Sequence, residues 1–230
     1  MISNRLISAY WILPFLLFSL AAAGHADTYL DLFPQLSKSA PSIGKQVLKN
    51  ALQATQCAVN SGLEAPKRLA VIDFSLPSDK KRLWVFDLQS ALLLFKELVS
   101  HGKKSGARVS QYFSNKVGSH QSSIGLFQAN ETYHGRHGYS LRLDGLEPGI
   151  NDKARDRAIV IHGADYVDPL WIENHGRIGR SQGCPAVRQE IVKELVDNLK
   201  GGQLLFTYYP DQKWLQSSPY LNCRDKMASL

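Results

Sequence analysis

Short apolar runs bounded by Gly, Pro, Asp or Asn recur along the chain after residue 65. Runs of this kind, rich in Val, Ile, Leu and aromatic residues, are typical of β-strands. The run at 91–99 is apolar throughout, so its pattern fits a buried strand or a helix equally well. The other runs predict strands at 68–74, 81–88, 123–133, 139–143, 158–161 and 203–208. Turn residues at 77–79 and at Gly138 predict that the runs on either side of each turn pair with each other.

Two segments place apolar residues at helical spacing instead. In the first, apolar residues recur from Val47 to Ala58, with Ser42 as the expected N-cap and Gly62 as the stop. In the second, every fourth residue from Val187 to Leu199 is apolar, and two glycines follow. We therefore expect two amphipathic helices, one before the strand-rich region and one before its last strand.

The segments between these elements carry small, polar and turn-forming residues, and we expect them to be irregular. They lie at 27–41, 102–122, 146–156, 165–180 and 210–230, and Trp171 and Ile172 are expected to pack inward. No internal repeat or low-complexity linker divides the chain, whose length suits one main domain. The pattern predicts a mainly β (α+β) core at 65–210, with a helical lead-in at 27–64 and a C-terminal tail at 211–230.

The N-terminus has the features of a secretory signal peptide. Arg5 supplies a positive start, Trp11–Ala23 an apolar stretch, and Gly24-His25-Ala26 a small-x-small cleavage site. An uncleaved anchor is the alternative, but the apolar stretch is short for a spanning helix of about 20 residues. We expect 1–26 to be removed, with no stable membrane anchor afterwards and a location in the periplasm or cell envelope.

Charge and cysteine content agree with export. The formal charge is +7, or +6 once Arg5 is removed with the leader, which suits an anionic envelope. No basic helix with interleaved aromatic residues suggests a nucleic-acid partner. Three cysteines are present, Cys57, Cys184 and Cys223. If Cys184 is a nucleophile, Cys57 and Cys223 are the candidate disulfide in an oxidising compartment. The alternative is a buried apolar Cys57 and an unpaired Cys223 in the tail.

The strongest candidate chemistry lies in the turn Gly179–Pro185, read with His162 at the end of a strand-like run. An imidazole can take the proton of a thiol, and the thiolate of Cys184 can then attack a carbonyl carbon. Gly183 allows the backbone to bend, so that the amides of Gly183 and Cys184 face the developing oxyanion. The helix expected from Val187 would further favour the thiolate. A lone cysteine is more often a small buried apolar residue, and this reading stays open.

Other polar residues near these motifs have two readings each. Arg180 suits a carboxylate clamp or a surface charge, and Ser181 suits a substrate contact or a turn. Asp165 and Asp168 are possible orienters of His162, and a backbone carbonyl is the alternative. The charges at 80–82 and 101–104 are expected to be solvated.

The sequence His134-Gly-Arg-His137 invites a zinc reading, alone or with His162 and Cys184. No acidic residue completes a zinc signature, so we expect no metal. A role for Tyr133, His134 and Arg136 in facing the substrate is favoured instead, and the plain alternative is that the histidines hydrogen-bond nearby loops.

These motifs resemble the L,D-transpeptidases of the YkuD type, and more specifically the branch of murein L,D-transpeptidase catalytic domains. The family carries a His-Gly pair and then a Ser/Thr-His-Gly-Cys turn, matched here by His162-Gly163 and by 181–184. Upstream, 122–127 resembles the family's Thr-Pro-x-Gly-x-Phe strand, and Tyr133-His134-Gly135 also matches the branch. The resemblance covers roughly residues 65–210 and implies a mixed β-sheet sandwich or barrel core with a few packed helices.

The chain departs from the family pattern at three points. Gln182 replaces the histidine of the turn, the interval from His162 to Cys184 is longer, and Ala186 stands where many relatives carry Asn or Arg. Arg180 or Arg188 would have to supply the missing cation. These departures leave the His–Cys pair intact and affect substrate recognition.

The resemblance implies chemistry on peptidoglycan stem peptides that needs no cofactor. Cys184 would attack the third residue of a tetrapeptide stem, D-Ala would leave, and a neighbouring amine would complete a 3→3 cross-link. An L,D-carboxypeptidase or endopeptidase using water, and a non-catalytic cell-wall binding module with a structural cysteine, are the alternatives. An enzyme predicts an exposed thiol of low pKa, and a binding module predicts an inert, buried one. The expected substrate-binding residues are Arg180, Ser181, Gln182, Tyr133, His134 and Gly163.

Overall fold

The computed structural model describes residues 28–223. The predicted signal peptide at 1–26 therefore lies outside the described residues, as does the end of the tail. Across residues 28–223, no helix is both long enough and apolar enough to span a membrane. The helices are η1 (Tyr29–Leu32), α1 (Phe33–Ser39), α2 (Lys45–Asn60), α3 (Pro169–His175), α4 (Gln189–Leu199) and α5 (Gln212–Ser217). The strands are β1 (Arg68–Asp73), β2 (Leu83–Asp87), β3 (Leu92–Glu97), β4 (Gly125–Gly135), β5 (Gly138–Gly145), β6 (Val160–Gly163), β7 (Ala186–Val187) and β8 (Gln203–Tyr208).

The eight strands form one mixed sheet in the order β3-β2-β1-β8-β4-β5-β6-β7. The last strand, β8, lies in the middle, parallel to β1 and antiparallel to β4. Both predicted antiparallel pairings, β1 with β2 and β4 with β5, are confirmed. The ambiguous run at 91–99 contains strand β3. The predicted mainly β fold is therefore confirmed.

The two ends of the sheet are joined by the segment that follows β3. The Ser100 amide donates to the Ala186 carbonyl of β7 at 2.9 Å, and the Ser181 amide donates to the His101 carbonyl at 3.0 Å. The Lys103 amide in turn donates to the Ser181 carbonyl at 2.8 Å. The sheet is thus nearly closed into a barrel, and residues 100–103, which close it, lie alongside the cysteine turn.

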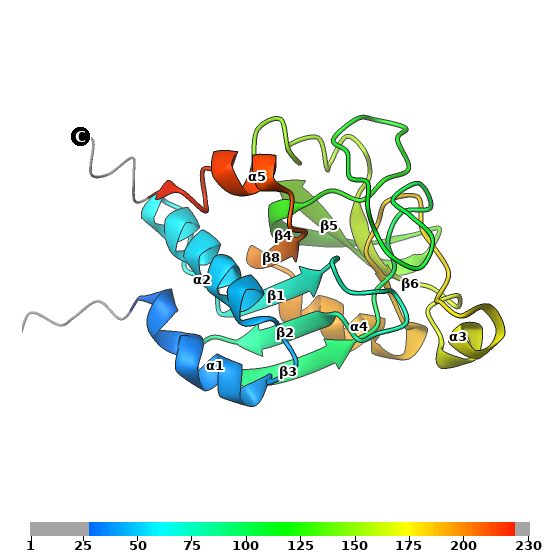
Figure 1. Ribbon diagram of the computed structural model, residues 1–230, viewed down its shortest axis with the longest axis horizontal. Coiled ribbons are helices and arrows are strands. Elements are labelled where there is room, and N and C mark those ends of the chain that lie inside the picture. Colours follow the sequence, from blue (N-terminus) through cyan, green and yellow to red (C-terminus); the bar gives the residue numbers. More distant parts are fainter. Residues whose placement is uncertain (1–27, 224–230) are drawn as a thin grey trace, which may run out of the picture.

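Helices cover both faces of the sheet, which explains why consecutive middle residues of β1 are apolar and buried. Along β1, Leu69 and Val71 pack with α2, whereas Ala70 and Ile72 pack with α4. Figure 1 shows α1, α2 and α5 on one side of the sheet and α3 at the opposite end, near β6. The alternation of side chains along a strand thus feeds two separate cores.

Three segments that we expected to be irregular contain helices. The first of these segments contains η1 and α1, and Leu36 of α1 is fully buried. Residues 165–180 contain α3, whose N-cap Asp168 accepts the Leu170 amide at 2.6 Å. The tail contains α5, capped by Asp211 and anchored by the buried Trp214. Short helices with few turns give almost no periodic signal, so the pattern of apolar residues does not reveal them.

Two boundaries and one loop also differ from expectation. Helix α2 begins at Lys45 with Gly44 as its N-cap, and Ser42 lies outside it. Helix α4 begins at Gln189, because 186–187 pair with β6 as strand β7. The loop at 146–156 is not simply a surface loop, since Glu147 is fully buried and accepts Leu126 N–H and Trp214 Nε1–H.

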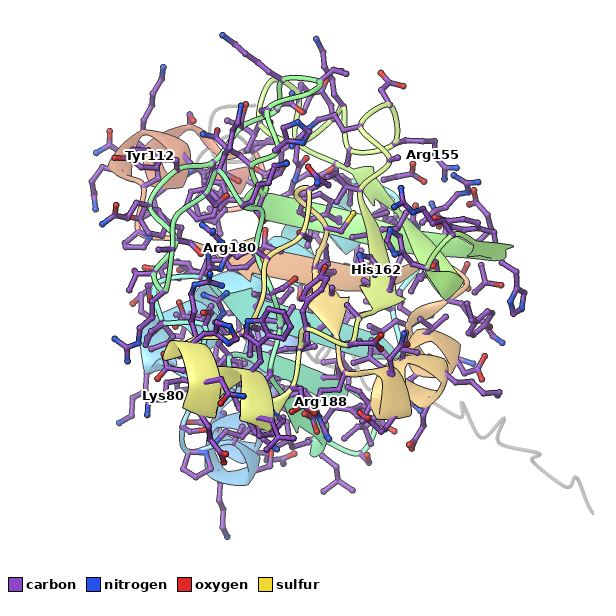
Figure 2. All side chains as sticks on the ribbon, turned by 90° about the vertical axis from the view of Figure 1, so that its right-hand side faces the viewer. Lys80, Tyr112, Arg155, His162, Arg180 and Arg188 are labelled. Carbon is purple, nitrogen blue, oxygen red and sulfur yellow. A yellow bond between two sulfur atoms is a disulfide. The ribbon has the colours of Figure 1, made fainter. Side chains whose placement is uncertain are left out.

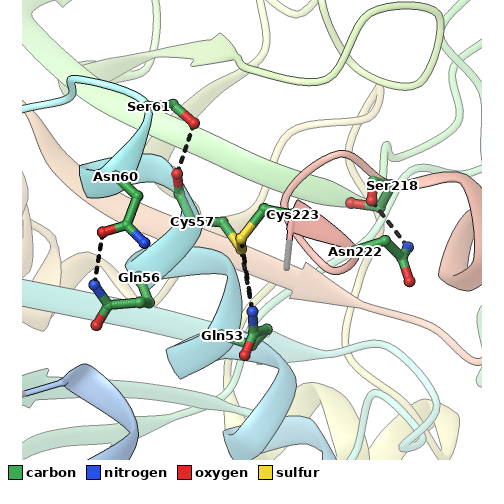
Figure 3. The surroundings of a disulfide bond; sticks show 8 residues. All are labelled: Gln53, Gln56, Cys57, Asn60, Ser61, Ser218, Asn222 and Cys223. Atoms are coloured by element: carbon green, nitrogen blue, oxygen red, sulfur yellow. Dashed lines mark hydrogen bonds between the residues drawn. A yellow bond between two sulfur atoms is a disulfide. The ribbon is translucent and has the colours of Figure 1, made fainter. Parts of the chain in front are cut away.

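The predicted disulfide between Cys57 and Cys223 is confirmed. The bond joins α2 to the end of the tail, across a sequence separation of 166 residues (Figure 3). The side-chain amide nitrogen of Gln53, one turn earlier in α2, lies 3.2 Å from the Cys57 sulfur. Cys184 is left as the free cysteine of the described chain.

Candidate active site

The turn that carries Cys184 is organised by Ser181. Its hydroxyl accepts the Gly183 amide at 3.0 Å and donates to the Cys184 carbonyl at 2.6 Å. Gly183 has φ +131°, and a Cβ there would lie 2.8 Å from the Gln121 carbonyl oxygen. The position therefore needs glycine for its backbone conformation and for the close approach of Gln121. We expected the Gly183 amide to face the oxyanion. In this structure it donates to the Ser181 hydroxyl instead.

A second layer of backbone supports this turn from behind. The Ser122 hydroxyl accepts the Gly102 amide at 3.0 Å and donates to the Gly183 carbonyl at 3.1 Å. A Cβ on Gly102 would lie only 2.9 Å from the Gly183 Cα. The cysteine turn is therefore clamped between Ser181 within it and Ser122 behind it.

The segment around His101 and Gly102, which supports the turn, is anchored by a buried charge. The expectation that the charges at 80–82 and 101–104 are solvated is therefore wrong for two residues. Arg82 and His101 are both fully buried, and Arg82 Nη2 donates to His101 Nδ1 at 2.7 Å. Burial, together with the charge of Arg82, lowers the pKa of His101 to about 3. The His101 side chain is thus neutral, and its backbone carbonyl accepts a hydrogen bond from the Ser181 amide.

The thiol of Cys184 lies against the start of β6. Its Sγ is 3.5 Å from the Ala158 carbonyl oxygen, and the residue is partly exposed. Burial raises the pKa of the thiol, while a hydrogen bond from the Val160 amide and the charge of Arg157 partly offset this rise. Ala158 has a positive φ of 52°, a conformation that a non-glycine residue adopts only when its surroundings enforce it. The low-pKa thiol that we expected for an enzyme is not found in this resting state.

Arg157 is a neighbour of the thiol that sequence reasoning missed. Its guanidinium donates to the carbonyls of Ser114 and Gln121 and to the hydroxyls of Ser119 and Ser123. These bonds fix the long loop before β4 next to the cysteine turn. No local motif marks this arginine, because all its partners lie more than thirty residues away in sequence.

His162 lies at the third position of β6, and only 2 % of it is exposed. Its Nδ1 lies 2.8 Å from the Gly163 carbonyl oxygen, so this nitrogen carries the hydrogen and Nε2 keeps the lone pair. A backbone carbonyl thus orients the ring, and Asp168 caps α3 instead. Burial lowers the pKa of His162, His137 lowers it further, and the bond to Gly163 opposes both.

The strand register brings the histidine and the cysteine to neighbouring positions. His162 of β6 pairs in parallel with Ala186 of β7, and Cys184 precedes Ala186 by two residues. Parallel partners point to the same side of a sheet. Cys184 therefore lies opposite Val160, and His162, two residues further along β6, lies on the same face of the sheet. Since the thiol pKa is raised and the imidazole pKa is lowered, the resting pair is a neutral thiol and a neutral imidazole.

A groove lies at the tip of the β4–β5 hairpin, next to Gly163 and helix α4. Its volume is about 420 Å³. The polar residues that line it are Arg136, His137, Tyr139, Asp165, Tyr166 and Gln189. The ring of His137 stacks on that of His162, with centroids 4.3 Å apart and planes 23° apart. His137 therefore both lines the groove and contacts His162, which is not itself a lining residue.

Tyr166 is another residue that the sequence gave no reason to select. Burial, together with the charge of a Cys184 thiolate, raises the pKa of Tyr166 to about 12, while a hydrogen bond with Ser100 opposes this rise. A Cβ on Gly179 would lie 2.4 Å from the Tyr166 Cβ. Gly179 therefore allows the stretch before the cysteine turn to pass directly over this tyrosine.

The predicted substrate-binding residues do not form a single cluster. Arg180 donates from Nη1 to the carbonyls of Lys103 and Gly106, at 3.2 and 2.9 Å, and in Figure 2 it lies apart from His162. Gln182 is exposed at the turn. Gly163 faces α4, where a Cβ would lie 2.0 Å from Gln189 Oε1.

The two candidates on β4 lie towards the hairpin tip. The guanidinium of Arg142 lies 4.3 Å from the centre of the Tyr133 ring, and the exposed His134 packs on Tyr139. Arg188, the alternative cation, pairs with the carboxylate of Glu97 at 3.0 and 3.1 Å. Substrate contacts by these residues stay predictions.

The zinc site considered for His134 and His137 finds no set of ligands within residues 28–223. No group of three or more His, Cys, Asp or Glu side chains there is placed to hold a metal ion. His134 and His137 instead pack on different rings, those of Tyr139 and His162.

A free cysteine in a clamped turn, next to an imidazole with one ring nitrogen held by a carbonyl, defines a thiol–imidazole site suited to acyl transfer. Residues 39–208 match the L,D-transpeptidase catalytic domain family, so the chain belongs to that family. This finding confirms the resemblance seen in the sequence motifs. No curated protein matches the chain.

Several solved structures are similar to the chain at low identity. An L,D-transpeptidase from Mycobacterium smegmatis is 15% identical, with a TM-score of 0.38 over 62% of this chain and 59% of that one. An L,D-transpeptidase (Yku) from Stackebrandtia nassauensis is 12% identical, with a TM-score of 0.38 over 80% and 91%. The helical cell shape determining protein Pgp2 from Campylobacter jejuni is 12% identical, with a TM-score of 0.40 over 69% and 57%. The chain thus spans about three-fifths of the length of the first of these structures.

Proposed function

We propose that the protein is a peptidoglycan L,D-transpeptidase that forms 3→3 cross-links between stem peptides through an acyl-enzyme on Cys184. One observation carries this proposal. The Cys184 thiol lies beside β6, where the Gly163 carbonyl fixes His162 Nδ1 and leaves Nε2 free to accept a proton. Membership of the L,D-transpeptidase catalytic domain family supports the class of substrate.

In the first step Cys184 becomes acylated. Nε2 of His162 takes the thiol proton as the sulfur attacks the carbonyl carbon of the third, diamino-acid residue of a tetrapeptide stem. The C–N bond to D-Ala then breaks, and the imidazolium returns the proton to the leaving amine. Because the resting pair is neutral, proton transfer accompanies attack and no preformed thiolate is required.

In the second step an amine of a neighbouring stem attacks the thioester. His162 takes a proton from that amine as the new amide bond forms. The C–S bond breaks, and the imidazolium returns the proton to the sulfur, which restores the Cys184 thiol. We assign the Cys184 amide to the oxyanion. The Gly183 amide would join it only by leaving Ser181 Oγ, its acceptor in the resting turn.

We further propose that the protein is exported to the periplasm or cell envelope. The Cys57–Cys223 disulfide fits an oxidising compartment, and the N-terminal sequence fits a cleaved leader. Peptidoglycan is then accessible to the folded enzyme.

The test is incubation of the mature protein with a disaccharide-tetrapeptide, followed by product analysis. A cross-linked dimer with release of D-Ala, absent with Cys184→Ala, is the expected result. Release of D-Ala with only shortened monomers would replace the transpeptidase with a hydrolase that uses the same acyl-enzyme. No change in the substrate would favour a non-catalytic binding module.

A further inference from the structure

His137 occupies the tip of a tight hairpin that reaches over the proposed base. Gly135 of β4 pairs with Gly138 of β5, so Arg136 and His137 alone form the connecting turn. Gly138 has φ +72°, whereas neither Arg136 nor His137 has a positive φ, so a glycine in the left-handed conformation directly after these two residues returns the chain to the hairpin. The backbone of the hairpin therefore fixes where His137 is presented.

At that position His137 covers one face of His162. The two rings are stacked with centroids 4.3 Å apart and planes 23° apart. His137 itself is exposed, whereas His162 is almost completely buried. The opposite restraint on His162 comes from the Gly163 carbonyl, which holds Nδ1 in the plane of the ring. One contact fixes the rotation of the imidazole, and the other limits its tilt.

The ionisable groups around the two rings come from three elements. The hairpin supplies Arg136 and Tyr139, the segment after β6 supplies Asp165 and Tyr166, and the cysteine turn supplies Cys184. Helix α4 faces the groove with the uncharged Gln189 and Val192. In addition to these groups, the charge of His137 itself lowers the pKa of His162.

We propose that His137 is a positioning residue that keeps the imidazole of His162 neutral and correctly oriented to accept the Cys184 proton. The role in catalysis rests on the function proposed above, whereas the effect on His162 itself does not. Burial disfavours a charge on His162, and a charge on the stacked ring of His137 disfavours it further. The pKa of His162 therefore lies below that of an ordinary histidine, which favours the free base.

The sign of the pH effect follows directly. A base must be unprotonated to act, and lowering its pKa extends activity towards acidic pH. Removing the charge of His137 while keeping a flat ring raises the pKa of His162, so the acidic limb of the pH–rate profile moves to higher pH. Removing the ring as well frees the imidazole to tilt and admits water.

The test compares His137→Phe and His137→Ala with the parent protein and with His175→Ala. His175 is a matched control, because its ring also stacks on an aromatic neighbour, Trp171, at 4.8 Å and 20°, but on helix α3. The His162 pKa is read by NMR from its ring C–H signals, and kcat and KM are measured across pH on the disaccharide-tetrapeptide.

We expect His137→Phe to raise the His162 pKa and to shift the acidic limb of the pH–rate profile to higher pH by the same amount. We expect His137→Ala to lower kcat by up to about a hundredfold, as misplaced catalytic groups do, with little change in KM. His175→Ala should change neither quantity. A His162 pKa unaltered in both His137 variants would overturn the proposal. An NMR shift in a protein without transpeptidase activity would keep the stacking effect and refute the proposed function.

Discussion

The disulfide between Cys57 and Cys223 gives the sharpest prediction of stability. Replacing both cysteines with alanine, in a Cys184→Ala background that prevents thiol exchange, removes the covalent link between α2 and the tail. Alanine is chosen because Cys57 is fully buried and a serine there would bury a hydroxyl. Everything else in the fold remains as it was.

The size of the effect follows from the loop that the bond closes. For a sequence separation of 166 residues, the chain-entropy relation gives about 5 kcal/mol. Measured losses usually fall at or below this figure, because unfolded chains retain some structure. We therefore expect the free energy of unfolding to fall by about 3–5 kcal/mol.

The assay is equilibrium unfolding in guanidinium chloride, with the Cys184→Ala protein as the parent. Reduction of that parent should reproduce the loss seen in the alanine variant. A variant within about 1 kcal/mol of the parent would refute the reasoning, because a link across so long a loop cannot be energetically neutral in this account.

Three further predictions concern the core and the site. Trp214→Ala should destabilise the fold by about 3–5 kcal/mol in the same assay, while Trp171→Ala, at a residue 37% exposed, should stay within about 0.5 kcal/mol; equal losses would contradict the burial argument. Gly163→Ala should cost about 1–3 kcal/mol through its clash with Gln189, and adding Gln189→Ala should restore most of it; no recovery would place the strain elsewhere. Because burial raises the thiol pKa, alkylation of Cys184 by iodoacetamide should be slow at neutral pH and accelerate at alkaline pH. A maximal rate already reached at neutral pH would instead indicate a preformed thiolate–imidazolium pair.

The sequence was most informative where the sheet is buried on both faces. The middle residues of β1 and β8, at 69–72 and 204–206, are consecutive apolar residues, as expected for strands buried on both faces. The pairing of β1 with β8 was not predictable, because β8 comes last in the chain and lies between β1 and β4 in the sheet. Pairings across such separations are set by the whole sheet and leave no local pattern.

Short helices escaped prediction for a related reason. In α5 the decisive feature is Trp214, whose Nε1 donates to the buried Glu147 carboxylate at 2.9 Å. That partner lies in a segment rich in turn residues, where the sequence suggested only a surface loop. A single long-range contact thus accounts for both errors.

Within the candidate site, the motif residues were found and their supports were not. Cys184 and His162 stand out by type and by context, whereas the supports of the site depend on contacts between distant segments. Arg157 is fixed by a loop more than thirty residues away, and His137 reaches His162 only because the hairpin turns at Gly138. Ser181 was chosen as a possible substrate contact, yet its hydroxyl is occupied within the turn.

The most direct test of the central claim is detection of the acyl-enzyme. Intact-protein mass spectrometry of the mature protein, mixed briefly with a disaccharide-tetrapeptide, should show an adduct equal to the substrate less D-Ala. Peptide mapping should place the adduct on Cys184, and Cys184→Ala should show none while keeping its disulfide and its fold. Release of D-Ala without a covalent adduct, or an adduct that persists in Cys184→Ala, would contradict the account.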